Sequence, residues 1–477
     1  MLFNSYLFIF CFLPLTLILY FGLNSLRRYE LAKALLICAS LIFYGYNEIR
    51  YVPVILSSIF VNYLCYLLLN KYPGIRKAVL ICGIAANLLL LGYFKYFDFL
   101  LENINRISGS SFDLLRIALP LGISFFTFQQ ISFLIDASRG ECQCKSFTDY
   151  CLFVTFFPQL VAGPIVSHDD MLPQFASENN KLPNSQNICT GIQAFSIGLF
   201  KKVIIADSFG KIVAYGYGNS AILTSFEALL TILSYTLQIY YDFSGYCDMA
   251  TGIGLMFNIH LPLNFNSPYK AATIVGFWKR WHITLTRFLT KYVYIPLGGN
   301  RKGIRRTYIN IFLVFLISGF WHGAGYTFII WGILHGLANV ICRFADSFIR
   351  KIPKWICWTA NFTFLNLTWV IFRSGSLQQA AQVIGRLFAG GLGISEQLRY
   401  DMVQISFLDM LNTVIPLRIL LAVCVALAII HCVFFKNTSE YIAEKKVSFS
   451  SLCLSAVLFI ASVLSLSGVS TFLYFNF

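Results

Sequence analysis

Charged residues are scarce in this sequence. Asp, Glu, Lys and Arg make up 12% of the 477 residues, whereas hydrophobic residues make up 57%. Soluble domains contain about 25% charged residues, so the composition excludes a soluble globular protein. Runs almost free of charge recur at residues 6–20, 51–69, 79–93 and 419–435. Each run approaches the roughly 20 apolar residues that a helix needs to cross a bilayer, and none alternates as a transmembrane β-strand would.

Several signatures of soluble enzymes are also missing. The sequence contains no P-loop, GxSxG elbow, HExxH motif or GxGxxG in a strand-to-helix context, which argues against an ATP-driven pump and a soluble-type hydrolase domain. The 14 cysteines are scattered, mostly inside apolar runs, and the one close pair, Cys142 and Cys144, lacks a second pair of ligands. Because a zinc site needs four ligands, or three and a water, no metal site is predicted.

The apolar runs predict an all-α integral membrane protein with about 11 to 13 transmembrane helices. Residues 1–21 lack a basic n-region and a small-residue cleavage site, so they are expected to form the first span rather than a signal peptide. No internal repeat or low-complexity linker divides the chain. Residues 1–477 are therefore expected to form a single membrane domain.

The net charge of +15 comes from basic residues in short loops. Arg27 and Arg28 follow the apolar run at residues 6–20, and Arg76 and Lys77 follow the run at residues 51–69. Cytoplasmic loops carry an excess of Lys and Arg, so these loops are expected in the cytoplasm. This explanation makes nucleic acid an unnecessary partner.

Candidate motifs are densest at residues 238–340, and polar residues are concentrated in the first part of that stretch, at residues 238–303. Irregular backbone inside a membrane persists only where protein or a water-filled cavity satisfies it. We therefore expect short helices and re-entrant loops around a cavity, with ionisable residues as candidate functional groups. Asp242 and Asp248 lie six residues apart, so an unbroken helix would place them on different faces. The alternative is a helix end at Ser244–Gly245 with Asp as a cap.

Three of the six histidines lie in unusual surroundings. His322 belongs to a helical, glycine-rich and aromatic segment, where a neutral imidazole can act as a general base or simply pack between helices. His335 follows thirteen residues later, about 140° away from the face of His322 if the helix is straight. His282, in FWKRWHITLTRF, is either a second polar wall of the cavity or an interfacial residue.

The segment around His282 is also rich in positive charge. A cytoplasmic surface explains this charge, and a phosphate-bearing donor substrate would also be attracted to it. The candidate donor-binding residues are Lys279, Arg280 and Arg287.

Six ordered motifs resemble the membrane-bound O-acyltransferase (MBOAT) family, in its bacterial branch of alginate and peptidoglycan O-acetyltransferase membrane subunits. They are PLGISFFTFQQISFLID (120–136), FFPQLVAGPIV (156–166), YYDFSGYCDMATGIG (240–254), LPLNFNSPY (261–269), FWKRWHITLTRFLTKYVYIPLGGNRKG (277–303) and SGFWHGAGYTFIIWGILHG (318–336). The resemblance implies a fold with a central tunnel and a base, His322, that activates an acceptor hydroxyl. It implies a positioning or second catalytic role for His282, and it places His335 in the closing HG.

The last six residues, FLYFNF (472–477), resemble the F-x-Y-x-x-F motif of the same branch. The implied role is an acyl relay, in which Tyr474 accepts the acyl group with help from His322. The alternative is a belt of aromatic side chains at the membrane interface.

The resemblance implies a function in the bacterial inner membrane. An acyl group, expected to be acetyl, moves from a cytoplasmic thioester such as acetyl-CoA across the membrane to a polysaccharide such as alginate or peptidoglycan. No cofactor is expected to stay bound, and a separate extracytoplasmic SGNH-type acyltransferase is expected to make the final transfer. One alternative is D-alanyl transfer to teichoic acid. Another is a transporter of lipid-linked sugars, which the lack of an inverted repeat argues against.

Overall fold

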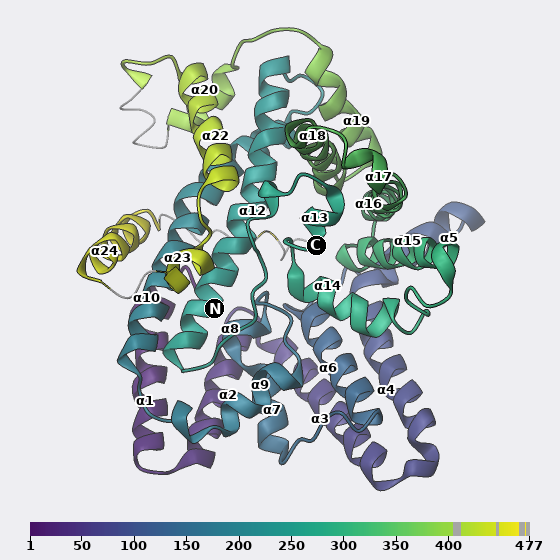
Figure 1. The fold of residues 1–477 in the computed structure, drawn as a ribbon, viewed down its shortest axis with the longest axis vertical. Coiled ribbons are helices and arrows are strands. Elements are labelled where there is room, and N and C mark those ends of the chain that lie inside the picture. The colour runs from purple at the N-terminus through teal and green to yellow at the C-terminus, as the bar shows by residue number, and fades with distance from the viewer. Residues whose placement is uncertain (404–411, 445–447, 467–472, 474–477) are drawn as a thin grey trace. The chain divides into compact units, whose positions relative to one another are not determined.

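The structure is a computed structural model that describes residues 1–403, 412–444, 448–466 and 473. The described residues are helical, with connecting turns and loops and no β-strand (Figure 1). They form two compact units. The first contains Met1–Gly198, Tyr246–Leu263 and the described part of Lys445–Asn476, and the second contains Leu199–Gly245 and Asn264–Glu444. The expectation of a single domain stays a prediction.

The first unit is built mainly from the N-terminal helices. A C-terminal helix joins them, because the Ser451 hydroxyl accepts a hydrogen bond of 2.8 Å from the Gln193 amide. The helices are α1 (Leu13–Ser25), α2 (Tyr29–Gly45), α3 (Val52–Lys71), α4 (Arg76–Leu91), α5 (Phe97–Ser108), α6 (Ile123–Ser138), α7 (Phe147–Thr155), α8 (Phe157–Leu160), α9 (His168–Ala176), most of α10 (Ser185–Phe200) and α24 (Phe449–Leu464).

The second unit contains all three candidate histidines. Short helices and loops at residues 257–302 follow the long helix α12 (Ser225–Met256), which crosses the boundary between the units, and those from Asn264 onward belong to the second unit. The prediction of short helices in the polar segment is therefore confirmed from residue 257 onward and is wrong for residues 238–256, which belong to the continuous helix α12. The other helices are α11 (Asp207–Gly218), α13 (Ile274–Trp278), α14 (Ile283–Leu289), α15 (Gly303–His322), α16 (Tyr326–Phe344), α17 (Asp346–Ile349), α18 (Lys354–Arg373), α19 (Leu377–Gly385), α20 (Glu396–Val403), α22 (Leu417–Phe434) and α23 (Thr438–Glu444).

Eight helical stretches in the described part of the chain are long and apolar enough to cross a membrane. They are Phe8–Ser25, Ile49–Lys71, Pro73–Ser108, Ser185–Gly218, Gly303–His322, Tyr326–Phe344, Lys354–Arg373 and Leu417–Phe434. This number is below the expected 11 to 13 because an apolar run does not fix the length of its helix. For example, α6 has 16 residues, fewer than the roughly 20 that span a bilayer.

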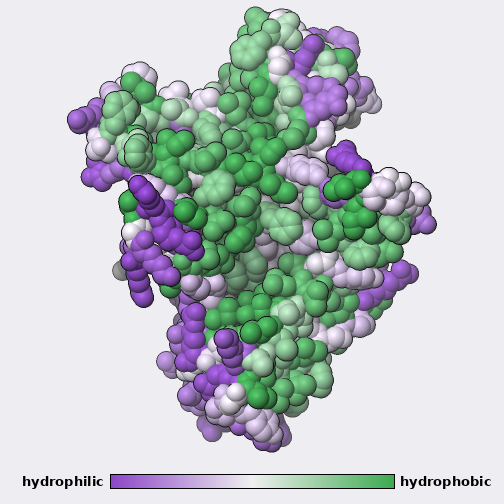
Figure 2. Space-filling view, turned by 90° about the vertical axis from the view of Figure 1, so that its right-hand side faces the viewer, coloured by the Kyte–Doolittle hydropathy of each residue, from purple (hydrophilic) through white to green (hydrophobic). Residues whose placement is uncertain are grey.

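The surface is unusually apolar for a folded protein. Large hydrophobic side chains are exposed on the candidate spans, for example Phe60, Leu89, Ile341 and Leu427. Figure 2 shows hydrophobic residues over much of the face that it displays, with hydrophilic residues gathered in separate patches. Such a surface suits contact with lipid tails, because the tails are as apolar as the exposed side chains. The protein is therefore an all-α, multi-pass membrane protein.

Candidate active site

The segment around His322 forms two helices instead of one. α15 ends at His322, the chain turns through Gly323–Gly325, and α16 returns beside α15 (Figure 1). A Cβ atom on Gly319 would lie 2.4 Å from the backbone oxygen of Phe328, so glycine is needed where the two backbones meet. The condition of a straight helix, under which His335 would be turned about 140° from His322, is not met, because the chain forms a tight hairpin between the two histidines.

His322 is enclosed by aromatic rings. Its side chain is 5% exposed, and its ring centroid lies 5.0 Å from that of Trp321 and 5.3 Å from those of Trp331 and Phe372. A histidine at a helix end, surrounded by indoles, is shielded from bulk water. That setting suits proton transfer at one defined position.

His335 is buried beside the same indole. Its ring centroid lies 4.6 Å from that of Trp331, so His322 and His335 neighbour the same side chain. Trp278 Nε1 donates to His335 Nδ1 at 3.2 Å. Because an indole N–H can only donate, Nδ1 accepts and the ring proton of neutral His335 is on Nε2. That nitrogen lies 3.1 Å from Thr368 Oγ1.

His282 lies at the start of α14, outside the eight candidate spans. Its backbone is left-handed, with φ of 46° and ψ of 53°, a conformation that costs an L-residue about 1–2 kcal/mol. The side chain is 1% exposed, and burial lowers the pKa of His282 from its ordinary value near 6.5 to about 3. The imidazole is therefore neutral at pH 7.

The rings around His282 connect it to His322. The His282 centroid lies 4.9 Å from Phe243, edge to face, and 6.4 Å from Trp321. Trp321 in turn contacts His322. The structure thus places all three predicted histidines in one aromatic cluster, in which His282 and His322 both neighbour Trp321, and His322 and His335 both neighbour Trp331.

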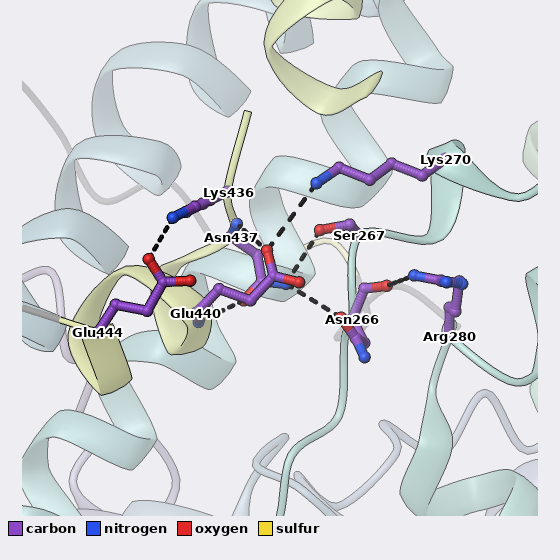
Figure 3. A network of polar contacts seen from close by, with 8 residues as sticks. All are labelled: Asn266, Ser267, Lys270, Arg280, Lys436, Asn437, Glu440 and Glu444. Atoms are coloured by element: carbon purple, nitrogen blue, oxygen red, sulfur yellow. Dashed lines mark hydrogen bonds and ion pairs between the residues drawn. The ribbon is translucent and has the colours of Figure 1, made fainter. Parts of the chain in front are cut away.

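The loop before His282 is held by a polar network (Figure 3). Asn266 N donates to Arg280 O at 2.9 Å, and Arg280 Nη1 donates to Asn266 O at 3.1 Å. The Asn437 amide donates to Asn266 Oδ1 at 3.2 Å and to Ser267 Oγ at 2.9 Å. Lys270 lies 3.9 Å from Glu440, which also accepts from Asn437 N at 3.1 Å. The segment at α23 therefore holds the loop at Asn266 and Ser267, which is hydrogen-bonded to Arg280, two residues before His282.

The candidate donor-binding residues differ in their exposure. Arg280 is half-buried and directed at Asn266, as described above. Lys279 and Arg287 are exposed, so they do not line the buried histidine cluster. A binding role for these two would have to lie on the surface of the unit.

Asp242 forms a buried ion pair. Lys202 Nζ lies 2.6 Å from Asp242 Oδ1 and 2.8 Å from Asp207 Oδ1. α12 continues without a break past Ser244–Gly245, so the alternative of a helix end capped by Asp is wrong. Asp248 is half-buried and belongs to the first unit, apart from the unit that holds the histidines.

Two residues at this site were not singled out from the sequence. Asn264 Oδ1 lies 3.1 Å from His282 Nδ1, but the 17 residues between them follow no periodicity that predicts contact. Lys202 could have been chosen from the sequence. It is an ionisable residue within an apolar run, and such residues are functional or paired by default. Tyr474, with Phe472 and Phe477 of the proposed relay motif, lies outside the described residues.

Comparison with known proteins agrees with the quoted motifs. The family model of the membrane-bound O-acyltransferases matches residues 138–376. The chain is 43% identical to the peptidoglycan O-acetyltransferase of Helicobacter pylori, over 100% of this chain and 98% of that protein. It is 38% identical to a probable alginate O-acetylase of Pseudomonas putida, over 82% of this chain and 81% of the relative. Similarity to the teichoic acid D-alanyltransferase of Bacillus subtilis is lower, 29% over 50% of this chain and 62% of that protein. The chain belongs to the membrane-bound O-acyltransferase family, and it is an O-acyltransferase.

Proposed function

We propose that this enzyme moves an acetyl group from cytoplasmic acetyl-CoA across the bacterial inner membrane for the O-acetylation of peptidoglycan. The observation that carries the proposal is the pair of buried histidines, His282 and His322, whose rings both neighbour Trp321. The choice of peptidoglycan is supported by the relative of that name, which is similar over the whole chain. The alginate relatives are similar over less of it.

In the proposed reaction His322 is the general base. It takes the phenolic proton of Tyr474, and the phenolic oxygen attacks the carbonyl carbon of the thioester. The carbon–sulfur bond breaks, and the coenzyme A thiolate takes the proton from the imidazolium. The product is an acetyl-tyrosine ester. Because a phenol has a pKa of about 10, it is a better leaving group than a sugar hydroxyl, and the ester can pass its acetyl group onward.

The proposed reaction also requires a route for the donor to His322 and a partner that receives the acetyl group. The donor reaches His322 through a central tunnel, and its phosphates are attracted by exposed Lys279 and Arg287. Tyr474 presents the acetyl group on the outer side. A separate extracytoplasmic SGNH-type acyltransferase then transfers it to the glycan. His335 supports the site indirectly, because it packs against Trp331, which contacts His322.

A second candidate, D-alanyl transfer to teichoic acid, is less well supported. The relative with that activity is similar over only half of this chain. In addition, the relay-like tyrosine stands in this chain itself, whereas the resemblance implies that it stands on a separate small peptide in that system.

The test is mass spectrometry of the purified enzyme after incubation with acetyl-CoA. We expect an added acetyl group on the peptide that contains Tyr474. The adduct should be absent in Tyr474→Phe and reduced about 100-fold or more in His322→Ala, because a general base contributes at least that factor. Tyr400→Phe, which changes an exposed tyrosine, is the matched control and should retain the adduct.

Two other outcomes would contradict different parts of the proposal. Release of coenzyme A without any adduct would reject the relay and leave direct transfer from the site of His322. If acetyl-CoA is not consumed but a D-alanyl thioester is, the acetyl donor is wrong. The O-acetyl content of peptidoglycan in a deletion strain, with and without the restored gene, tests the acceptor.

A further inference from the structure

We propose that Asn264 is a positioning residue that holds neutral His282 in one tautomer, with the ring proton on Nδ1 and the lone pair on Nε2. The consequence for catalysis depends on the proposed function, because it concerns what His282 can do in acetyl transfer. The assignment of the proton itself depends only on the contacts of the two side chains.

The orientation of the Asn264 amide is fixed by Thr284. The backbone N–H of Thr284 lies 3.3 Å from Asn264 Oδ1, and the Thr284 hydroxyl donates to the same oxygen at 2.9 Å. A backbone N–H is only a donor. If the amide were flipped, two N–H groups would point at each other. The atom that faces Thr284 is therefore the carbonyl oxygen.

The tautomer of His282 follows from that orientation. His282 Nδ1 lies 3.1 Å from the same oxygen of Asn264. A carbonyl oxygen can only accept, so Nδ1 has to donate and carries the proton. In a neutral imidazole only one nitrogen is protonated, so Nε2 holds the lone pair. His282 can then accept a proton or a hydrogen bond through Nε2.

Asn264 is itself well placed to impose this choice. Its backbone oxygen accepts from Ile283 N at 3.0 Å, so Asn264 is bound to the His282 segment through both backbone and side chain. Two residues further on, Asn266 is held by Arg280 and Asn437 (Figure 3). The loop therefore cannot shift without breaking several hydrogen bonds.

The side chain of Asn264 is an uncharged amide, and this affects the protonation of His282. A carboxylate at this position would also orient the ring, but its charge would stabilise the imidazolium. The Asn264 amide is a neutral acceptor, and the ring neighbours Phe243 and Trp321 carry no charge. Asn264 thus orients His282 and leaves it a neutral base.

His335 provides an internal comparison. Its Nδ1 accepts from Trp278 Nε1, so its proton is on Nε2, the opposite of His282. Nitrogen NMR of the full-length enzyme labelled with ¹⁵N-histidine distinguishes protonated from unprotonated ring nitrogens. The chain has only six histidines, and the His282 signals are identified by their loss in His282→Gln.

We expect the NMR spectrum of the wild type to show His282 protonated at Nδ1. Asn264→Leu should lose this preference, and Asn264→Asp should keep it while His282 titrates at a pH about 1–3 units higher, because a carboxylate favours the charged ring. A wild-type spectrum with His282 protonated at Nε2 would overturn the proposal. So would an unchanged tautomer in Asn264→Leu.

Steady-state kinetics test whether the orientation of His282 by Asn264 matters for catalysis. Asn264→Leu should lower kcat about 10–100-fold, a typical loss for a residue that orients a functional histidine, with KM for acetyl-CoA within about twofold. Asn264→Asp should recover part of kcat at pH 8. Asn366→Leu is the control, because Asn366 is buried and its Oδ1 accepts from Thr236 at 2.6 Å. Equal losses in both leucine variants would reject a specific role.

The two proposals fail in different ways. If the wild type consumes no acetyl-CoA, the proposed function is rejected, and the NMR measurement still decides the tautomer. If acetyl transfer is observed and the tautomer is the opposite one, only the role of Asn264 is rejected.

Discussion

The site holds two neutral histidines whose lone pairs are on different nitrogens. The lone pair of His335 already accepts a hydrogen bond from Trp278, so His335 cannot take a proton at Nδ1 without losing that bond. This arrangement favours a supporting role for His335 near Trp331. His322, which ends α15 beside both Trp321 and Trp331, remains the proposed base.

The buried state of His282 predicts a dependence of stability on pH. Its folded pKa of about 3 is below the ordinary 6.5, so the unfolded chain binds a proton first as the pH falls. Titration of His282 does not change the free energy of unfolding above pH 6.5 and lowers it progressively from pH 6.5 toward pH 3. At pH 5 the loss is about 2 kcal/mol, at 1.36 kcal/mol per unit.

The prediction is checked by thermal unfolding in detergent at pH 7.5 and pH 5. Acidification should lower the Tm of the wild type more than that of His282→Gln, which has no group to titrate. His260→Gln, at an exposed histidine, should respond like the wild type. If acidification lowers the Tm of His282→Gln as much as that of the wild type, His282 is not held neutral.

At the scale of residues, the sequence predicted which histidines belong to the candidate site, but it did not predict the residues that contact them. His322 and His282 could be chosen from the residues and the motifs, since each lies in an aromatic segment of the polar middle. Asn264 could not, because its contact with His282 depends on a left-handed turn at His282 and on backbone pairing with Ile283. Neither leaves a periodic pattern in the sequence.

At the scale of elements, the hairpin of α15 and α16 determines where His322 lies. The two helices approach through Gly319 and Gly332, where added Cβ atoms would lie 2.4 Å and 2.6 Å from backbone oxygens. Backbone atoms cannot rotate away as side chains can, so any substitution has to separate the helices. His322 is three residues from Gly319 and would move with α15.

We therefore expect Gly319→Ala to lower kcat about 10-fold or more and to cost about 1–3 kcal/mol of stability, as overpacking does. Gly22→Ala is the matched control, because a Cβ atom there meets nothing within 4 Å. That variant should retain activity and gain up to about 1 kcal/mol from the higher helix propensity of alanine. Activity and Tm measured on both variants check this. Wild-type kcat in Gly319→Ala would show that the hairpin does not position His322.

The elements that the sequence misjudged share a cause. The segment at His322 was expected to be one helix, and Ser244–Gly245 was a possible helix end. Small residues permit both a turn and a close helix contact, so the sequence does not decide between them. Tertiary contacts decide: α12 continues through its glycine, and α15 stops at the glycines that follow His322.

At the scale of the whole molecule, composition alone predicted the fold class. A chain with 12% charge and long apolar runs can only satisfy its backbone in a membrane as helices or a closed barrel, and continuous runs select helices. The number of spans was less predictable, because helix length depends on where turns occur. The division into two units had no signal in the sequence, since their boundary crosses α12 and returns at Leu263.

The left-handed backbone at His282 has a practical consequence for chemical rescue. Glycine adopts positive φ without the penalty paid by other residues, so His282→Gly removes the ring while relaxing the chain at φ of 46°. The vacated space still contains the Asn264 oxygen, a hydrogen-bond acceptor for a soluble imidazole. Added imidazole should therefore restore part of the activity of His282→Gly and much less of that of His282→Leu, measured as coenzyme A release.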